Sequence, residues 1–321
     1  MKLLKLVPDN TNIDFMGVRN IALILSLLVT IAALVLVGIR GLNLGVDFVG
    51  GQMIRTTFSQ PVDVEQLRGR VDGLGLGEAS IQEFGGPTSF QIRLPRPEGG
   101  EASANAAASR VRQLLAQQYP GSRVDSVETV SGRVSEELAR DGLLALVLAM
   151  LGVALYIWFR FEWQFGVGAL ATLFHDVSLI LGFFALTQWQ VDLNIVAAFL
   201  AIVGYSLNDT VVIYDRIREN LRKFRKMAMV PLLNLSLNET LSRTIVTSGS
   251  ILLALGMLLL FGPDVIFGLT FAIFFGTIIG TYSSIYVSAP MLVWLGAKPD
   301  SFIRAEETDA APVKRSDGAV V

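Results

Sequence analysis

The stretch Asn194–Asn220, NIVAAFLAIVGYSLNDTVVIYDRIREN, begins as an apolar run and ends in a basic segment. Its apolar part, Leu193 to Ile213, is long enough to cross a bilayer as a helix. One carboxylate, Asp209, lies inside it, where a charged Asp costs roughly 2.5–3.5 kcal/mol on insertion scales. Such a group is protonated, paired or in contact with water. The stretch therefore predicts both a membrane helix and a site that handles ions.

The rest of the chain has the composition of a membrane protein, with 321 residues, 52% of them hydrophobic and only 17% charged. Apolar runs of suitable length predict a polytopic α-helical membrane protein with six transmembrane helices, at residues 20–39, 143–159, 165–186, 193–213, 245–261 and 265–293. With no cysteine, the chain forms no disulfide and has no thiolate chemistry. No nucleophile constellation, metal cluster or nucleotide loop is evident, so we expect neither an enzyme nor a bound cofactor or metal.

Basic residues in short loops predict the orientation, because they favour the cytoplasmic side. They follow the fourth span, at Arg216, Arg218, Arg222, Lys223, Arg225 and Lys226. Both termini are then cytoplasmic, and the long loop is periplasmic. The predicted domains are a cytoplasmic N-terminus (1–19), the first helix (20–39), a periplasmic domain (40–141), a five-helix remainder (142–297) and a cytoplasmic tail, expected to be disordered (298–321).

Residues 221–242 mix basic, apolar and amide side chains, which predicts an interfacial helix between the fourth and fifth spans. Their basic residues lie next to the membrane, with no base-stacking aromatic beyond Phe224. Anionic phospholipid is therefore the expected partner, and nucleic acid is not.

The long loop changes between strand and helix periodicity. Alternation predicts strands at 52–58, 79–84, 89–94 and 123–130, and helical spacing predicts helices at 61–74 and 102–119. The order β-α-β-β-α-β is typical of a ferredoxin-like α+β domain, with both helices on one sheet face. We expect the other face to be free to meet a partner. A spacer that only caps the bundle is the alternative.

Three segments resemble the SecF family of protein-export membrane subunits, within the resistance-nodulation-division superfamily. They are LGVDFVGG (44–51), LFHDVSL (173–179) and VGYSLNDTVVIYDRIREN (203–220), and the resemblance extends over nearly the whole chain. It implies a bacterial inner-membrane protein that uses the proton motive force, and no cofactor, in late steps of polypeptide export. The implied partners are a SecD-like subunit, a SecYEG-type channel and the translocating polypeptide.

The resemblance assigns proton coupling to Asp209 and Arg243. Arg243 begins the fifth span, and an antiparallel helix brings it to a depth similar to that of Asp209, where it would stabilise the carboxylate. Asn208 and Tyr205 offer hydrogen bonds to the same carboxylate. The alternative is a fixed ion pair that only locks the fourth helix to the fifth.

His175 and Asp176 lie near the middle of the third span, and His175 is the chain's one histidine. Its ordinary pKa suits a proton relay. Alternatively, Asp176 bonds a backbone group or a polar group of a partner subunit.

Two glycine-rich segments are interpreted as structural. Gly45, Asp47, Gly50 and Gly51 form the junction between the first span and the outer domain; without a Gly-Lys-Ser/Thr ending they make no phosphate loop. The last span carries small residues every four positions, which let a second helix pack closely, from this chain or another: Gly268, Ala272, Gly276 and Gly280.

Two other functions remain open. One is half of a proton-coupled exporter of small solutes in the same superfamily, although such exporters carry larger outer domains. The other is a structural subunit of the translocon that uses no energy.

Overall fold

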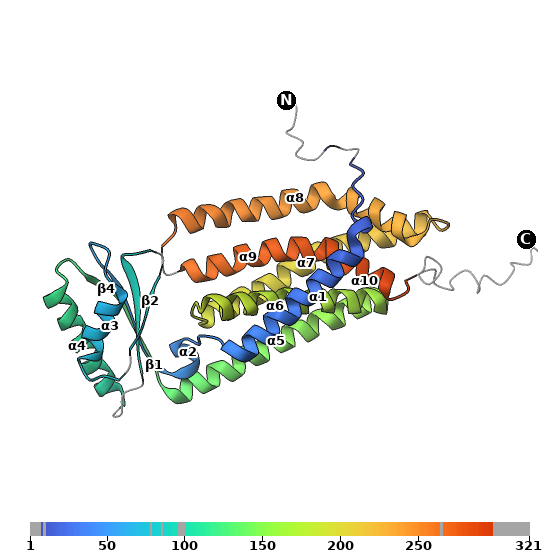
Figure 1. The fold of residues 1–321 in the computed structure, drawn as a ribbon. Helices are drawn as coiled ribbons and strands as arrows, with labels where there is room; N and C mark the ends of the chain where they lie inside the picture. Colours follow the sequence, from blue (N-terminus) through green and yellow to red (C-terminus); the bar gives the residue numbers. More distant parts are fainter. Residues whose placement is uncertain are drawn as a thin grey trace, which may run out of the picture.

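The computed structural model describes residues 8, 11–77, 79–84, 86–95, 100–263 and 266–297. Six apolar helical segments form a bundle, and a small domain with a four-stranded sheet lies at one end of it (Figure 1). The segments are α1 (Arg19–Arg40), preceded by a 3₁₀ turn (Met16–Val18), α5 (Gly132–Arg160), α6 (Trp163–Thr187), α7 (Leu193–Lys223), α8 (Met229–Phe261), and a last span made of α9 (Phe267–Ser283), a π-helical turn (Ser284–Ser288) and α10 (Ala289–Trp294). The six predicted spans are confirmed.

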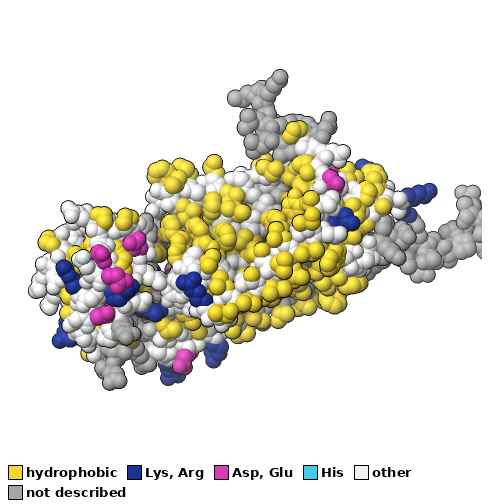
Figure 2. All heavy atoms as spheres, viewed as in Figure 1, with side chains coloured by type: hydrophobic (Ala, Val, Ile, Leu, Met, Phe, Trp, Pro, Cys, Tyr) yellow, Lys and Arg dark blue, Asp and Glu magenta, His cyan; other side chains and the backbone are white. Residues whose placement is uncertain are grey.

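On the face of the molecule seen in Figure 2, apolar side chains cover most of the bundle, and charged side chains gather towards its two ends and on the sheet domain. This distribution suits a membrane, whose hydrocarbon core tolerates helices because their backbone groups are internally hydrogen-bonded. The helices of the bundle are buried to very different degrees. Of the 18 consecutive residues that are most apolar in each helix, 61% are buried in α6, but only 6% in α5 and 11% in α8. Helix α6 is therefore central, while α5 and α8 leave broad apolar faces outward.

Two boundaries differ from the sequence-based expectation. Helix α5 begins at Gly132, ten residues before the expected domain boundary, because the Ser131 hydroxyl caps it by accepting from the Val134 amide. The interfacial helix expected at 221–242 is wrong. Helix α7 continues to Lys223 and α8 already begins at Met229, so both spans extend beyond the apolar runs and a five-residue link joins them.

The sheet domain has the predicted element order: β1 (Gly51–Thr57), α3 (Val64–Asp72), β2 (Ser80–Glu83), β3 (Ser89–Leu94), α4 (Gly100–Gln118) and β4 (Arg123–Val130). The strands are arranged β2-β3-β1-β4 and every pair is antiparallel. Alternate side chains of the strands, such as Ile54, Phe90 and Ile92, pack with Leu67 of α3 and Val111 of α4 in one buried core. Both helices thus cover the same face of the sheet, the face turned away from the bundle (Figure 1).

The opposite face of the sheet is not free, contrary to the expectation above. The Arg93 guanidinium donates to the Leu44 carbonyl (2.5 Å), and the Gln82 amide donates to the Gln188 carbonyl (3.3 Å). Leu44 forms an isolated parallel bridge with Val191, in the link between α6 and α7. The sheet therefore sits on the rim of its own helix bundle, at the end where α7 begins. The short helix α2 (Val46–Val49) lies at this junction.

The small residues of the last span face α7 of the same chain. A Cβ on Gly276 would lie 2.6 Å from Ile202 Cδ1, and one on Gly280 would lie 3.1 Å from Ser206 Cβ. A similar contact joins α6 to α1, where a Cβ on Gly182 would lie 2.5 Å from Ala33 Cβ. Glycine permits these approaches, which bring polar groups of neighbouring helices within hydrogen-bonding distance.

Candidate functional site

The carboxylate of Asp209 lies between three helices and is 7% exposed. Thr244 of α8 donates its hydroxyl to Oδ1 (2.9 Å), and Ser284 of the π-helical turn donates to Oδ2 (2.8 Å). Each carboxylate oxygen thus has one neutral donor. Because α7 continues ten residues past the apolar run, Asp209 is near the middle of the helix, 16 residues from Leu193 and 14 from Lys223.

The other residues expected around Asp209 are placed differently. Arg243 is exposed on α8, next to Thr244, and the described part of the chain has no ion pair between it and Asp209. It remains close enough for charge attraction. Asn208 is exposed, and the Tyr205 hydroxyl donates to Ser248 (2.8 Å). Adjacent helix positions point about 100° apart, so similar depth along neighbouring helices does not bring two side chains into contact.

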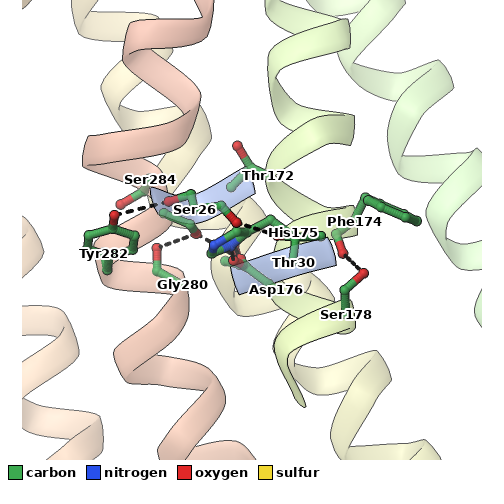
Figure 3. A network of polar contacts seen from close by, with 12 residues as sticks. Ser26, Thr30, Thr172, Phe174, His175, Asp176, Ser178, Gly280, Tyr282 and Ser284 are labelled. Atoms are coloured by element: carbon green, nitrogen blue, oxygen red, sulfur yellow. Dashed lines mark hydrogen bonds and ion pairs between the residues drawn. The ribbon is translucent and has the colours of Figure 1, made fainter. Parts of the chain in front are cut away.

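A second buried carboxylate, Asp176, lies on α6 and is 1% exposed. Its Oδ2 accepts from Ser206 of α7 (2.5 Å) and from Ser283 of α9 (2.9 Å), while His175 Nδ1 is 2.9 Å from Oδ1. Figure 3 shows this cluster, with Ser26 and Thr30 of α1 beside it. The structure thus brings His175 and Asp176 together, and the donors to Asp176 include side chains of two neighbouring helices.

Sequence reasoning missed the three serines whose hydroxyls reach the carboxylates, Ser206, Ser283 and Ser284. Ser284 follows Gly280 by four residues and so continues the stripe of small residues in the last span, whereas Ser283 lies off that stripe. The helix widens into a π turn at Ser284–Ser288, shortly before Pro290, which has no amide hydrogen to give to the Tyr286 carbonyl. The proline was the available signal for a π turn near the Ser-Ser pair that precedes it. π turns are frequent at functional sites, which would have made these serines candidates for the site.

The glycine-rich junction holds the start of α7. Asp47 accepts from the Leu193 amide (2.9 Å), and Asp192 accepts from the Ile195 amide (3.0 Å), so two carboxylates cap one helix. Gly50 and Gly51 have φ of 74° and 119°, in the region that favours glycine. Gly45 has φ of −71°, but a Cβ there would lie 3.2 Å from the Val191 carbonyl oxygen. The junction motif therefore shapes the backbone and supports α7.

Asp192 lies just outside the spanning part of α7. Burial raises the pKa of this carboxyl above its ordinary value, and the nearby Asp47 carboxylate raises it further. The Ile195 amide and the Arg55 guanidinium lower the pKa but do not offset the burial. The surroundings of Asp192 thus disfavour its charge.

Comparison with known proteins identifies the family. The family described as "Protein export membrane protein SecD/SecF, C-terminal" matches residues 110–298, and the "SecD/SecF GG Motif" matches residues 35–62. The chain belongs to the SecD/SecF protein-export family. Named "Protein translocase subunit SecF", a relative from Cereibacter sphaeroides is 45% identical over 91% of this chain and 92% of its own length. A Pseudomonas aeruginosa relative of the same name is 42% identical, over 92% and 96%.

Solved structures agree with this SecD/SecF assignment. The chain is similar to SecDF from Thermus thermophilus, described as a translocon-associated membrane protein, with a TM-score of 0.84 and 33% identity over 91% of the chain. For SecDF in the super-membrane-facing form the TM-score is 0.67, at 34% identity over 92%. The chain spans 40% of either SecDF chain. We conclude that it is a multi-pass protein of the bacterial inner membrane and a SecF-type accessory subunit of protein translocation.

Proposed function

We propose that this SecF-type subunit uses the transmembrane proton gradient to promote late steps of polypeptide export, with Asp209 as the proton-binding group. The observation that carries the proposal is the pair of neutral hydroxyl donors, Thr244 and Ser284, on the two oxygens of a buried carboxylate. A hydroxyl can donate to an ionised carboxylate and accept from a protonated one. Both charge states of Asp209 are therefore compatible with these surroundings.

A fixed ion pair between Asp209 and Arg243 is the main alternative. It would hold the carboxylate ionised, as a nearby guanidinium does. In this structure hydroxyl groups are the direct partners of Asp209, and Arg243 is exposed. The geometry favours an arginine that influences the carboxylate from a distance over one that locks it.

The energy available from a proton is sufficient to bias the bundle. One elementary charge that crosses 100 mV yields about 2.3 kcal/mol. Coupling free energies between sites in proteins are typically about 1–3 kcal/mol. Protonation of one carboxylate between α7, α8 and the last span can thus shift the packing of these helices.

Helix α7 provides the mechanical connection to the outer domain. Its first amide, at Leu193, donates to Asp47 of the junction, and Leu44 pairs with Val191 just before the helix. We propose that a shift of α7 moves this junction, and with it a ferredoxin-like domain on the periplasmic side that acts on the emerging polypeptide. The strand order β2-β3-β1-β4, with both helices on one face, supports that fold.

The same proposal places both termini in the cytoplasm. It rests on the basic residues at the inner end of α7 and in the link to α8, where they would also contact anionic phospholipid: Arg222, Lys223, Arg225 and Lys226.

The outward faces of α5 and α8 support a partner within the membrane. These helices are sparsely buried, and α8 exposes Arg243 beside apolar residues such as Ile245 and Val246. An arginine that faces lipid is costly, whereas one that faces another subunit is not. We propose a SecD-like subunit as the cover, and a SecYEG-type channel that delivers the polypeptide to the assembly.

Asp209→Asn tests this function in membrane vesicles that contain the whole complex. We expect normal assembly and the loss of the part of translocation that depends on the proton gradient. Asp215→Asn is the matched control, because Asp215 is on the same helix but is exposed and pairs with Arg160 (3.1 Å). Gradient-dependent translocation at the control rate in Asp209→Asn would contradict the proposal.

The two rival functions are separated by the same vesicles. A structural subunit that uses no energy would contribute equally after the gradient is collapsed with an ionophore. A solute exporter would leave polypeptide translocation unaffected by either substitution.

A further inference from the structure

The second carboxylate, Asp176, is also buried and also accepts from a serine of the last span, but its Oδ2 has two serine donors and its Oδ1 is next to His175 Nδ1. Ser283 donates to Asp176 Oδ2 (2.9 Å), and the next residue, Ser284, donates to Asp209 Oδ2 (2.8 Å). Consecutive residues of one helix thus contact carboxylates on two different helices, α6 and α7. The change from α to π geometry at Ser284 is where this occurs. One turn of the last span therefore joins the two acids.

Each of these serines also has a second acceptor on its own helix. The Ser283 hydroxyl is 3.2 Å from the Gly280 carbonyl, and the Ser284 hydroxyl is 3.0 Å from the Thr281 carbonyl. A hydroxyl has one proton, which it gives to the carboxylate while that group is ionised. When the acid is protonated, the acid donates to the serine oxygen, and the serine proton turns to the helix carbonyl. Rotation of a hydroxyl hydrogen therefore satisfies either state.

The two acids also meet at one face of α7: Asp209 is on this helix, and Asp176 of α6 contacts it through Ser206. Ser206, which donates to Asp176, is three residues before Asp209, and side chains at this spacing are neighbours on a helix. Gly280 brings α9 against Ser206 and so closes the cluster. Two ionised carboxylates so arranged in a low-dielectric bundle repel each other, which makes ionisation of one favour protonation of the other.

Other titratable groups face the cluster from its surrounding helices. On the Asp176 side they are His175 of α6 and Tyr282 of α9, whose rings have centroids 6.3 Å apart. On the Asp209 side the nearby charge is Arg243 of α8. From α1, the described side chains drawn beside the cluster are the hydroxyls of Ser26 and Thr30 (Figure 3). Arg243 attracts the Asp209 carboxylate, whereas His175 contacts the Asp176 carboxylate, so the two acids have different surroundings.

We propose that Asp176 is a second proton-binding group, whose ionisation is coupled to that of Asp209, and that Ser283 and Ser284 are the positioning residues that hold the two acids against one helical turn. This inference rests on the proposed function of Asp209 and extends it. The proton that the bundle binds then has two buried locations, one on α6 and one on α7. Movement of the proton between these two locations would change the hydrogen bonds of α6, α7 and the last span.

Infrared difference spectroscopy of the full complex in lipid vesicles, titrated with pH, tests the proposal. The carbonyl stretch of a protonated carboxyl reports each acid, and Asp176→Asn and Asp209→Asn assign the bands. We expect two titrating bands. Asp176→Asn should weaken the proton affinity of Asp209 by at least about fivefold, which is the lower end of typical site-to-site coupling.

Single serine substitutions then test the positioning role without removing either acid. Ser283→Ala should make the Asp176 band persist to a higher pH and leave the Asp209 band in place, because the charge-assisted bond that the ionised Asp176 loses is stronger than the neutral bond that the protonated acid loses. Ser284→Ala should do the reverse. Ser288→Ala is the control, since its buried hydroxyl donates to the Ser284 carbonyl of its own helix (2.5 Å) and should move neither band.

The outcomes distinguish the two proposals. If Asp209 titrates but Asp176 keeps one charge state at every pH, or if Asp176→Asn leaves the Asp209 midpoint unchanged, the inference about Asp176 is wrong and the function of Asp209 stands. If Asp209 itself never titrates, both are wrong. Equal shifts from Ser283→Ala, Ser284→Ala and Ser288→Ala would show a general loosening of the bundle and refute the positioning role.

Discussion

Asp192→Asn should strengthen the outer end of α7 at neutral pH. The pKa of Asp192 is raised from its ordinary value of 3.8, mainly by burial, so the folded state binds this proton more tightly than the unfolded state does. A raised carboxyl pKa means that stability is lost as the pH rises through the interval between 3.8 and the folded-state value. Asparagine has no charge to bury. The gain in stability of Asp192→Asn over the wild type is therefore absent near pH 4, and it reaches its full size above the folded-state pKa of Asp192.

Asp192→Ala separates the contribution of the helix cap from that of the buried charge. Asparagine and aspartate are about equally good helix caps, so Asp192→Asn keeps an acceptor for the Ile195 amide, 3.0 Å away in the wild type. Alanine removes the acceptor, at a cost of about 1 kcal/mol. That cost corresponds to about fivefold more frequent opening of the first turn of α7. Relative to asparagine, this cost should be the same at all pH values, because neither side chain carries a charge; the difference between asparagine and wild type should instead depend on pH.

Hydrogen exchange measures this opening directly. Exchange of the amides at residues 193–196, corrected for its intrinsic pH dependence, follows the population of the locally open state. At pH 7 we expect Asn to exchange more slowly than both wild type and Ala, and at pH 4 wild type and Asn should coincide and Ala should exchange faster than either. An Asp192→Asn variant that exchanges faster than wild type at pH 7, or whose advantage grows as the pH falls, would refute the reasoning.

Two further predictions concern packing and docking. Gly182→Ala should separate α1 from α6 and destabilise the bundle by about 1–3 kcal/mol. The added Cβ would lie 2.9 Å from Ala33 Cα and 2.5 Å from Ala33 Cβ. Thermal unfolding in detergent measures the loss of stability, and an unchanged unfolding midpoint would contradict this prediction. Arg93→Gln should loosen the sheet domain from the bundle rim, since the shorter side chain cannot reach the Leu44 carbonyl. Spin-label distances between engineered cysteines in this cysteine-free chain should broaden, whereas the control Arg68→Gln, at a half-buried arginine that pairs with Glu65 within the sheet domain, should leave them narrow; equally narrow distances in both would refute the contact.

The spans and the sheet domain could be predicted because their signals are local. Apolar runs locate the helices, and alternation locates strands such as Ser89–Leu94 and Arg123–Val130, which the structure reproduces at the same residues. The ends of the helices were harder to predict from the sequence. Polar residues beyond an apolar run continue a helix wherever nothing stops it, as α7 does to Lys223, and hydropathy alone does not register this.

The candidate site was predictable in its acids and not in their partners. Burial of Asp209 and Asp176 follows from their depth in apolar spans. Which group meets each carboxylate depends on helix rotation and on the phase change at Ser284, and both are tertiary features. Arg243 was expected to contact Asp209 because of its charge and depth, but Thr244, one position further along, makes the contact.

The length of α7 has a mechanical consequence. With 31 residues it is about 46 Å long, and Asp209 is near its midpoint. If the basic rim anchors one extremity among lipid headgroups, tilting this rod by about 5° sweeps the opposite extremity through about 4 Å. Small displacements near the acid, which leave the packing between the helices intact, would thus become a movement of several ångströms at the far end of α7. That end is next to the sheet domain.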